Sequence, residues 1–162
     1  MYQIKQQPDL EKNYQLMAYM AKRVLEDTTD ITAALSNLSA VLNGYLNDIN
    51  WVGFYIMKNG GLVLGPFQGL PACVNIPVGK GVCGTAVAQC KMQIVDDVSK
   101  FPGHIACDSA SKSEIVIPIY NKEEVYGVLD VDSPILNRFG KLENKYLSEI
   151  CALLEKFLSE VQ

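Results

Sequence analysis

Residues 114–133, EIVIPIYNKEEVYGVLDVDS, constrain the fold of this chain more than any other segment. Two stretches rich in β-branched residues flank the short polar turn KEE, which predicts an antiparallel hairpin. Because successive side chains of a strand point to opposite faces, Asp130 and Asp132 share one face, about 7 Å apart at Cα. We expect Tyr126 on that face too, and Glu114 on the face opposite the isoleucines of its strand. The hairpin therefore predicts a sheet with one apolar and one acidic face.

Helical spacing of apolar residues marks both ends of the chain. Asp9 and Asp30 each precede such a segment, and aspartate is favoured at a helix N-cap. A third amphipathic segment extends from about Leu142 to Val161. Between them lie the strand-like stretches NWVGFYI, GLVLGPFQG, CVNIPVG and MQIVDDV, and the small-residue stretch GVCGTAVAQC, which predicts a short helix. Two helices before and one after an antiparallel sheet predict a single α+β domain over residues 1–162.

The composition excludes several function classes. With 49% hydrophobic and 20% charged residues, the chain has the composition of an ordinary globular domain. Its formal net charge of -4 comes without a basic stripe, so we expect no nucleic-acid partner. No apolar run approaches the roughly 20 residues that cross a bilayer, and the N-terminal segment lacks a signal pattern, which predicts a cytoplasmic protein that does not enter membranes. In a reducing compartment, five cysteines are expected to be redox-active, metal-binding or inert rather than structural disulfides.

Cys107 lies in an unusual setting for a cysteine. Its segment FPGHIACDSASKSE contains Pro102 and Gly103, which break regular structure, and a run of small polar residues. A cysteine that only fills a core usually has apolar neighbours, so a thiol in such a loop points to chemistry. His104 stands three residues earlier and raises the alternative of a Cys–His pair, although the loop leaves the direction of the imidazole open.

The acidic sheet face has a functional and a structural interpretation. Like charges at short range raise the pKa of at least one carboxyl group, which leaves a proton available near neutral pH. Such a group can donate a hydrogen bond or a proton to a ligand oxygen, while ionised neighbours bind an ammonium group. A divalent metal is a rival use of the same residues, and solvated acids near strand ends are the structural alternative. Strand register, which the sequence leaves open, decides whether Glu114 lies beside Asp130 or Asp132.

Four stretches between about Trp51 and Phe139 carry the most specific pattern in the chain. They are NWVGFYI, LGPFQGLPACVNIPVGKGVCGTA, VDDVSKFPGHIACDSASKSEIVIPI and GVLDVDSP. Together they closely resemble the free methionine-(R)-sulfoxide reductase family, whose members are single GAF domains. Most GAF domains are small-ligand sensors, so the fold alone does not fix a function. The specific part, which excludes Cys90 and Cys151, comprises Cys73, Cys83, Cys107, Glu114, Asp130 and Asp132.

The resemblance implies a repair chemistry for oxidised free methionine. In that family the cysteine matching Cys107 attacks the sulfoxide sulfur and becomes a sulfenic acid as methionine leaves. A cysteine matching Cys73 or Cys83 condenses with it to a disulfide, which thioredoxin or another thiol reduces without a cofactor. We predict Cys73 as the resolving thiol because it follows GLPA, a loop able to move, whereas Cys83 precedes a predicted helix. Its place near a helix start predicts a lowered pKa for Cys83.

The other residues of the expected site would bind the substrate, together with the three carboxylates. Trp51 and Tyr55 share a strand face and could wall a pocket around the substrate methyl group, with core packing as the alternative. The backbone N–H groups of Ile105, Ala106 and Cys107 could hold a carboxylate if their loop forms a nest of amides. The expected architecture is an antiparallel sheet with helices on one face and a ligand pocket on the other.

Two other classes fit parts of the sequence. A non-catalytic GAF sensor of a small ligand would leave the three thiols unexplained. A zinc site of Cys73, Cys83, Cys107 and His104 would lack the Cys-x-x-Cys spacing common in structural zinc sites, so we expect no metal. Selectivity for the R epimer and for free over peptide-bound sulfoxide follows from the resemblance alone. The oligomeric state stays open, and a homodimer is compatible with the sequence.

Overall fold

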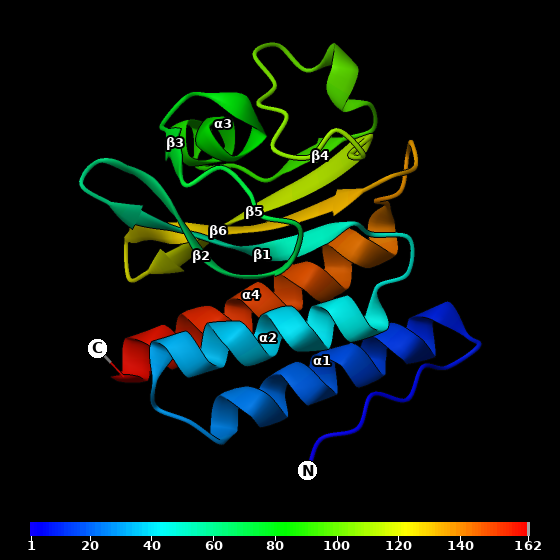
Figure 1. Ribbon diagram of the computed structural model, residues 1–162. Coiled ribbons are helices and arrows are strands. Elements are labelled where there is room, and N and C mark those ends of the chain that lie inside the picture. Colours follow the sequence, from blue (N-terminus) through cyan, green and yellow to red (C-terminus); the bar gives the residue numbers. More distant parts are fainter. Residues whose placement is uncertain (162) are drawn as a thin grey trace.

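The computed structural model describes residues 1–161 as four α-helices, one 3-10 turn and six strands (Figure 1). In chain order the elements are α1 (Leu10–Glu26), α2 (Ile31–Tyr45), β1 (Trp51–Lys58), β2 (Gly61–Gly69), β3 (Asn75–Pro77), α3 (Gly81–Gln89), β4 (Gln93–Val95), η1 (Val98–Lys100), β5 (Ser113–Asn121), β6 (Glu124–Ser133) and α4 (Lys141–Val161). The strands form one antiparallel sheet in the order β3-β2-β1-β6-β5-β4. The first and last long strands, β1 and β6, are therefore central neighbours.

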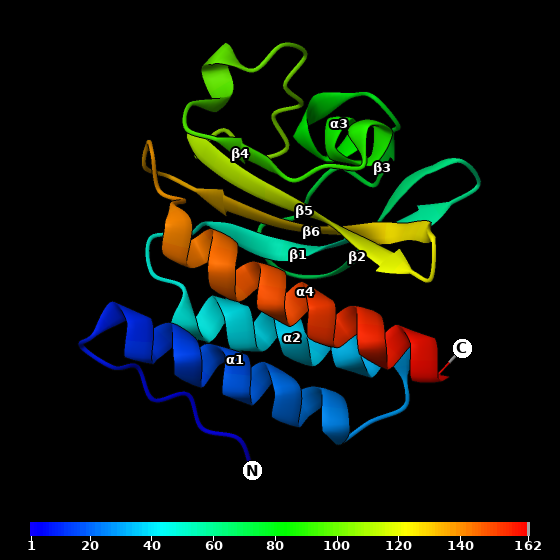
Figure 2. The ribbon, with the colours of Figure 1, turned by 180° about the vertical axis from the view of Figure 1, so that it is seen from behind.

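The helices divide unequally between the two faces of the sheet. Figures 1 and 2 show α1, α2 and α4 on one side and α3 with the long loop after β4 on the other. Helices α2 and α4 pack against the strands, and α1 packs on both of them as an outer layer. Ile115 and Leu129 belong to the helix-side core, whereas Val116 and Val128 belong to a second core under α3. The predicted α+β architecture, with an apolar sheet face under the helices, is confirmed.

The helix starts follow the sequence closely. The Asp9 carboxylate accepts a hydrogen bond from the N–H of Lys12, and Asp30 accepts one from Ala33, each at 2.8 Å. Both predicted N-caps are thus confirmed. Among residues 1–161, no helix combines the length and the apolar character that crossing a membrane requires.

Strand β6 departs from the prediction at Tyr126. Its pairing with β5 shifts between Ile119 and Tyr120, so Tyr126 is the extra residue of a β-bulge. Tyr126 packs against the helix-side core, while Val125 packs against the core under α3. Our expectation that Tyr126 shares the face of Asp130 was wrong, because the bulge interrupts the two-residue period of the strand.

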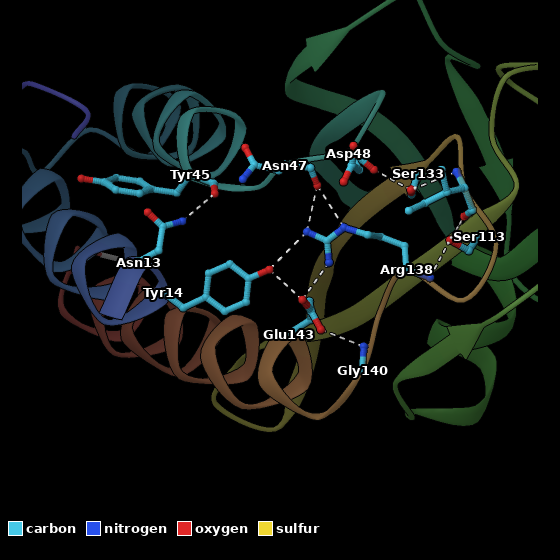
Figure 3. Close-up of polar contacts among 11 residues, drawn as sticks. Asn13, Tyr14, Tyr45, Asn47, Asp48, Ser113, Ser133, Arg138, Gly140 and Glu143 are labelled. Carbon is cyan, nitrogen blue, oxygen red and sulfur yellow. Dashed lines mark hydrogen bonds and ion pairs between the residues drawn. The ribbon is translucent and has the colours of Figure 1, made fainter. Parts of the chain in front are cut away.

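A buried ion pair ties α1 and α4 to the loop between α2 and β1 (Figure 3). Arg138 donates to the Glu143 carboxylate at 2.7 Å and also to the carbonyl of Asn47. Tyr14 donates to the same carboxylate oxygen at 2.6 Å, and the Gly140 N–H donates to the other oxygen at 2.8 Å. Burial alone would raise the pKa of Glu143, but these hydrogen bonds outweigh it and lower that pKa.

We expect Arg138→Met to destabilise the fold by about 2 kcal/mol near neutral pH, because the Glu143 carboxylate loses its buried cation. Since the folded pKa of Glu143 lies below the unfolded value, its ionised form adds stability above about pH 4, which is lost as pH falls through the folded pKa. The destabilisation should therefore shrink in acid. Urea denaturation at about pH 7 and about pH 3 measures it. The exposed Arg23→Met is the control, and equal losses from both variants would contradict the assignment.

Candidate active site

A pocket lies between the sheet and the residues of α3 and the loop after β4 that line it. Figure 1 shows α3 and this loop, the roof of the pocket, over the sheet face opposite α2 and α4. The pocket encloses ≈ 500 Å³, including the part open to solvent. Eight residues predicted for the site line it: Trp51, Tyr55, Cys83, Ile105, Cys107, Glu114, Asp130 and Asp132. The sheet supplies its floor and inner wall, and the roof supplies two of the cysteines.

Strands β5 and β6 bring the three carboxylates together on the pocket floor. Glu114 pairs directly with Asp132, which in turn pairs with Trp51 on β1. Asp130 lies on the same face, two residues earlier on β6 and opposite Val116. The structure thus settles the register that the sequence left open: Glu114 is directly opposite Asp132.

Each of the three carboxyl groups has a pKa raised well above its usual value. Burial is the largest cause in all three. The second cause is the charge of a neighbouring carboxyl group: Asp132 acts on Glu114, Glu114 on Asp130, and Asp130 on Asp132. Within residues 1–161, the buried Oδ1 of Asp130 has no hydrogen-bond partner. A buried pair of carboxyl groups such as Glu114 and Asp130 retains a proton at neutral pH and can donate it to a ligand oxygen.

The prediction of a lowered pKa for Cys83 was wrong. Helix α3 holds Cys83 in its first turn, as expected, but the buried Sγ faces Oε1 of Glu114 at 4.0 Å. Burial, followed by the charges of Asp130 and Glu114, raises the pKa of the thiol. These effects outweigh the helix N-terminus, so Cys83 stays a neutral thiol.

Cys73 and Cys107 are joined in a disulfide, with Cα atoms 5.5 Å apart. Tyr55 Oη donates to the carbonyl of Cys73 at 2.9 Å, and Trp51 Nε1 donates to the carbonyl of Leu70 at 3.2 Å. In the disulfide form the GLPA loop is therefore anchored at both ends, whereas we expected it to be mobile. The alternative zinc set is not assembled, because two of its thiols bond to each other.

Potential metal ligands do cluster elsewhere in the pocket. Within residues 1–161, Cys83, Glu114 and Asp130 offer ligand atoms that all lie within 4.8 Å of one another. Two of these groups are carboxyls with raised pKa values and the third is a neutral thiol. A metal bound at this cluster would have to displace the protons that these groups hold.

The loop that carries Cys107 is held by contacts that sequence reasoning missed. Asn50 Nδ2 donates to Oδ2 of Asp108 at 2.9 Å and to Oγ of Ser111 at 3.0 Å. Asn50 lies far from this loop in the chain, and no local signal could have found it.

His104 lies beside the acidic floor. Its Nε2 is 3.7 Å from Oε2 of Glu114, and burial lowers the pKa of the imidazole. His104 thus belongs to the carboxylate cluster, which weakens the case for a Cys–His pair.

Only some of the backbone N–H groups expected to bind a carboxylate around residue 105 are free to do so. The Cys107 N–H donates to the carbonyl of Ile105 at 3.1 Å, which closes a tight turn. Ile105 lines the pocket, whereas Ala106 is exposed and is not part of the lining. The structure therefore brings Ile105 to the site and leaves Ala106 outside it.

Comparisons with known proteins identify the family. The GAF domain family model matches residues 21–161. The free methionine-R-sulfoxide reductase of Escherichia coli is 53% identical over 131 residues, which are 81% of this chain and 79% of that protein. This chain belongs to the free methionine-R-sulfoxide reductase family.

Solved structures of reductases in this family have the same fold. The enzyme of Staphylococcus aureus in complex with substrate is 52% identical with a TM-score of 0.86, covering 90% of this chain and 95% of that chain. The free methionine-R-sulfoxide reductase of Neisseria meningitidis, in complex with its substrate, is 40% identical with a TM-score of 0.95, covering 99% and 98%. The GAF fold expected from the sequence is confirmed.

The acidic floor predicts a stability that falls as pH rises. Because the folded pKa values of Glu114, Asp130 and Asp132 lie above the unfolded values, the folded chain binds more protons, and stability is lost from about pH 4 up through the raised pKa values. We expect Asp130→Asn to reduce this slope by up to about 1 kcal/mol per pH unit. Urea denaturation across the range measures it, with the exposed Glu123→Gln as control. A slope unchanged by Asp130→Asn would disprove the raised pKa.

Proposed function

We propose that this protein reduces free L-methionine-(R)-S-oxide to L-methionine. The proposal depends on one observation: the Cys73–Cys107 disulfide adjoins a pocket floored by carboxyl groups with raised pKa values. A thiol pair that can be oxidised and a proton donor are the two components that sulfoxide reduction needs. Reductases named for this substrate are similar over most of the chain, which supports the same activity here.

The proposed substrate pose uses the whole pocket. The rings of Trp51 and Tyr55 are stacked at 5.8 Å and would enclose the methyl group. An ionised member of the acidic floor, with Asp132 the least buried, would bind the ammonium group. The backbone N–H group of Ile105 is the proposed partner of the substrate carboxylate. A free amino acid, rather than a methionine within a polypeptide, is the proposed substrate, as the names of the similar reductases state for theirs.

The proposed reaction begins with attack of the Cys107 thiolate on the sulfoxide sulfur. The Glu114–Asp130 pair protonates the sulfoxide oxygen, which makes the sulfur a better electrophile. The oxygen ends on Cys107 as a sulfenic acid, and methionine leaves as the reduced thioether. The Cys73 thiol then attacks the sulfenic acid, which forms the disulfide and releases water. Cys83, as a neutral buried thiol, is a secondary participant that could relay the disulfide onward.

A dithiol must return the enzyme to its starting state. We propose thioredoxin as this reductant and the cytoplasm as the location, because two thiols of one protein can reduce the disulfide by exchange. No cofactor enters the scheme. The proposed steps take place within one chain, so they proceed equally in a monomer and in a homodimer.

The direct test offers the separate R and S epimers of free methionine sulfoxide with dithiothreitol and follows methionine release. We expect the R epimer alone to be consumed, and an N-acetylated, C-amidated methionine sulfoxide to be refused. A non-catalytic GAF sensor would instead bind a ligand without producing methionine. Release from neither epimer would overturn the proposed function.

Single cysteine substitutions separate the proposed roles. We expect Cys107→Ser to lower turnover by at least about 1000-fold, because the nucleophile is lost. Cys90→Ser and Cys151→Ser should retain nearly full turnover, since Cys90 is an exposed helix C-cap and Cys151 packs in the helix-side core. Methionine release under dithiothreitol is the measurement. Equal loss in Cys90→Ser would show that the roles are wrongly assigned.

The resolving thiol can be identified by peptide mapping after one turnover without reductant. We expect a Cys73–Cys107 crosslink, because the two Cα atoms lie within disulfide range. In Cys73→Ser the sulfenic acid should persist and turnover with thioredoxin should fall. A dominant Cys83–Cys107 crosslink, with full turnover of Cys73→Ser, would reverse the two roles.

A further inference from the structure

We propose that Tyr55 is a positioning residue whose hydroxyl holds Cys73 in place for disulfide formation. The inference rests on the proposed function, since it assigns one step of that reaction. Tyr55 Oη donates to the backbone carbonyl of Cys73 itself at 2.9 Å. The hydroxyl therefore acts on the resolving cysteine, in addition to any contact that the Tyr55 ring makes with the substrate.

Tyr55 is well suited to hold a loop. It lies in the middle of β1, a central strand paired on both sides, and its side chain is 1% exposed. Burial is the largest cause that raises the pKa of its phenol, and the neighbouring Asp130 carboxyl adds to it. The hydroxyl thus remains a proton donor throughout the working pH range, and the carbonyl that it binds is fixed relative to the sheet.

Other hydrogen bonds hold the two ends of the loop that carries Cys73, so removal of the Tyr55 hydroxyl should act mainly at Cys73 itself. Trp51 Nε1 binds the carbonyl of Leu70 at one end of the loop, and the N–H of Leu64 binds the carbonyl of Val74 at the other. Both ends thus have anchors of their own. The Tyr55 hydrogen bond acts at the residue that carries the sulfur.

Disulfide geometry makes this position sensitive. The Cα atoms of Cys73 and Cys107 are 5.5 Å apart, and a disulfide cannot form without backbone movement beyond about 7 Å. A displacement of about 1.5 Å would therefore remove Cys73 from reach. Cys107 would then remain as a sulfenic acid, because condensation with the Cys73 thiol and loss of water require contact between the two sulfurs.

Tyr55→Phe tests the role, because it removes the hydroxyl and keeps the ring that lines the pocket. In one turnover without reductant, methionine release reports the first step, which consumes the Cys107 thiol. Loss of a second free thiol reports disulfide formation, and dimedone traps the sulfenic acid. We expect the rate of disulfide formation to fall about fivefold more than the rate of methionine release. A factor of about five corresponds to the loss of one hydrogen bond that contributes about 1 kcal/mol. In a Cys73→Ser background, Tyr55→Phe should add nothing to the trapped sulfenic acid.

Tyr120→Phe is the matched control. The Tyr120 hydroxyl also donates to a cysteine carbonyl, that of Cys90 at 3.2 Å, but outside the pocket. We expect the ratio of the two rates to stay unchanged in this variant. A shift of equal size in Tyr120→Phe would indicate a general loss of stability and overturn the assignment.

A second readout is independent of methionine sulfoxide. Equilibration with reduced and oxidised glutathione measures how readily Cys73 and Cys107 pair, and Tyr55→Phe should weaken pairing about fivefold. If native protein releases no methionine, the proposed function fails. If native protein is active while Tyr55→Phe changes both rates in parallel and leaves the glutathione equilibrium intact, the inference about Tyr55 fails alone.

Discussion

The two-residue period of β5 and β6 is the constraint on which the rest of the structure depends. It places the isoleucines of β5, with Leu129 and Val131 of β6, in the core on the helix side of the sheet, and the residues that alternate with them face the other way. On that opposite face the same period presents Glu114, Asp130 and Asp132 to the pocket. A slip of one residue would bury acids under the helices and expose the isoleucines. The hydrophobic core therefore fixes the geometry of the acidic floor.

Burying acids beside thiols gives the cysteines of this domain distinct environments. Cys83 packs directly on Glu114 and Asp130, and its burial, together with these neighbouring acids, keeps its thiol neutral. Cys73 and Cys107 are half-buried at the pocket margin, on segments tied to β1 by Tyr55 and Asn50. The acids can thus hold a proton on the pocket floor, while Cys73 and Cys107 lie on other segments of the chain. Burial pattern, rather than residue type, distinguishes these thiols.

Local sequence signals were sufficient for much of this architecture. The N-caps Asp9 and Asp30, the hairpin and the shared face of Asp130 and Asp132 all follow from periodicity and residue type. Features that depend on long-range packing were not accessible in this way. The bulge at Tyr126 interrupts the alternation, and the register opposite Glu114 depends on pairing along the whole hairpin. The high pKa of Cys83 was missed because a helix start is visible in the sequence, whereas the carboxylates that α3 meets are not.

The disulfide also defines a ring of chain. Cys73 and Cys107 are 34 positions apart in the chain, and the segment between them contains the edge strands β3 and β4 as well as α3 and η1 of the pocket roof. A crosslink over this length removes conformational entropy from the unfolded chain, and its reduction restores that entropy. The oxidised domain is therefore expected to resist unfolding more than the reduced domain. The difference falls on the segment that carries the pocket roof.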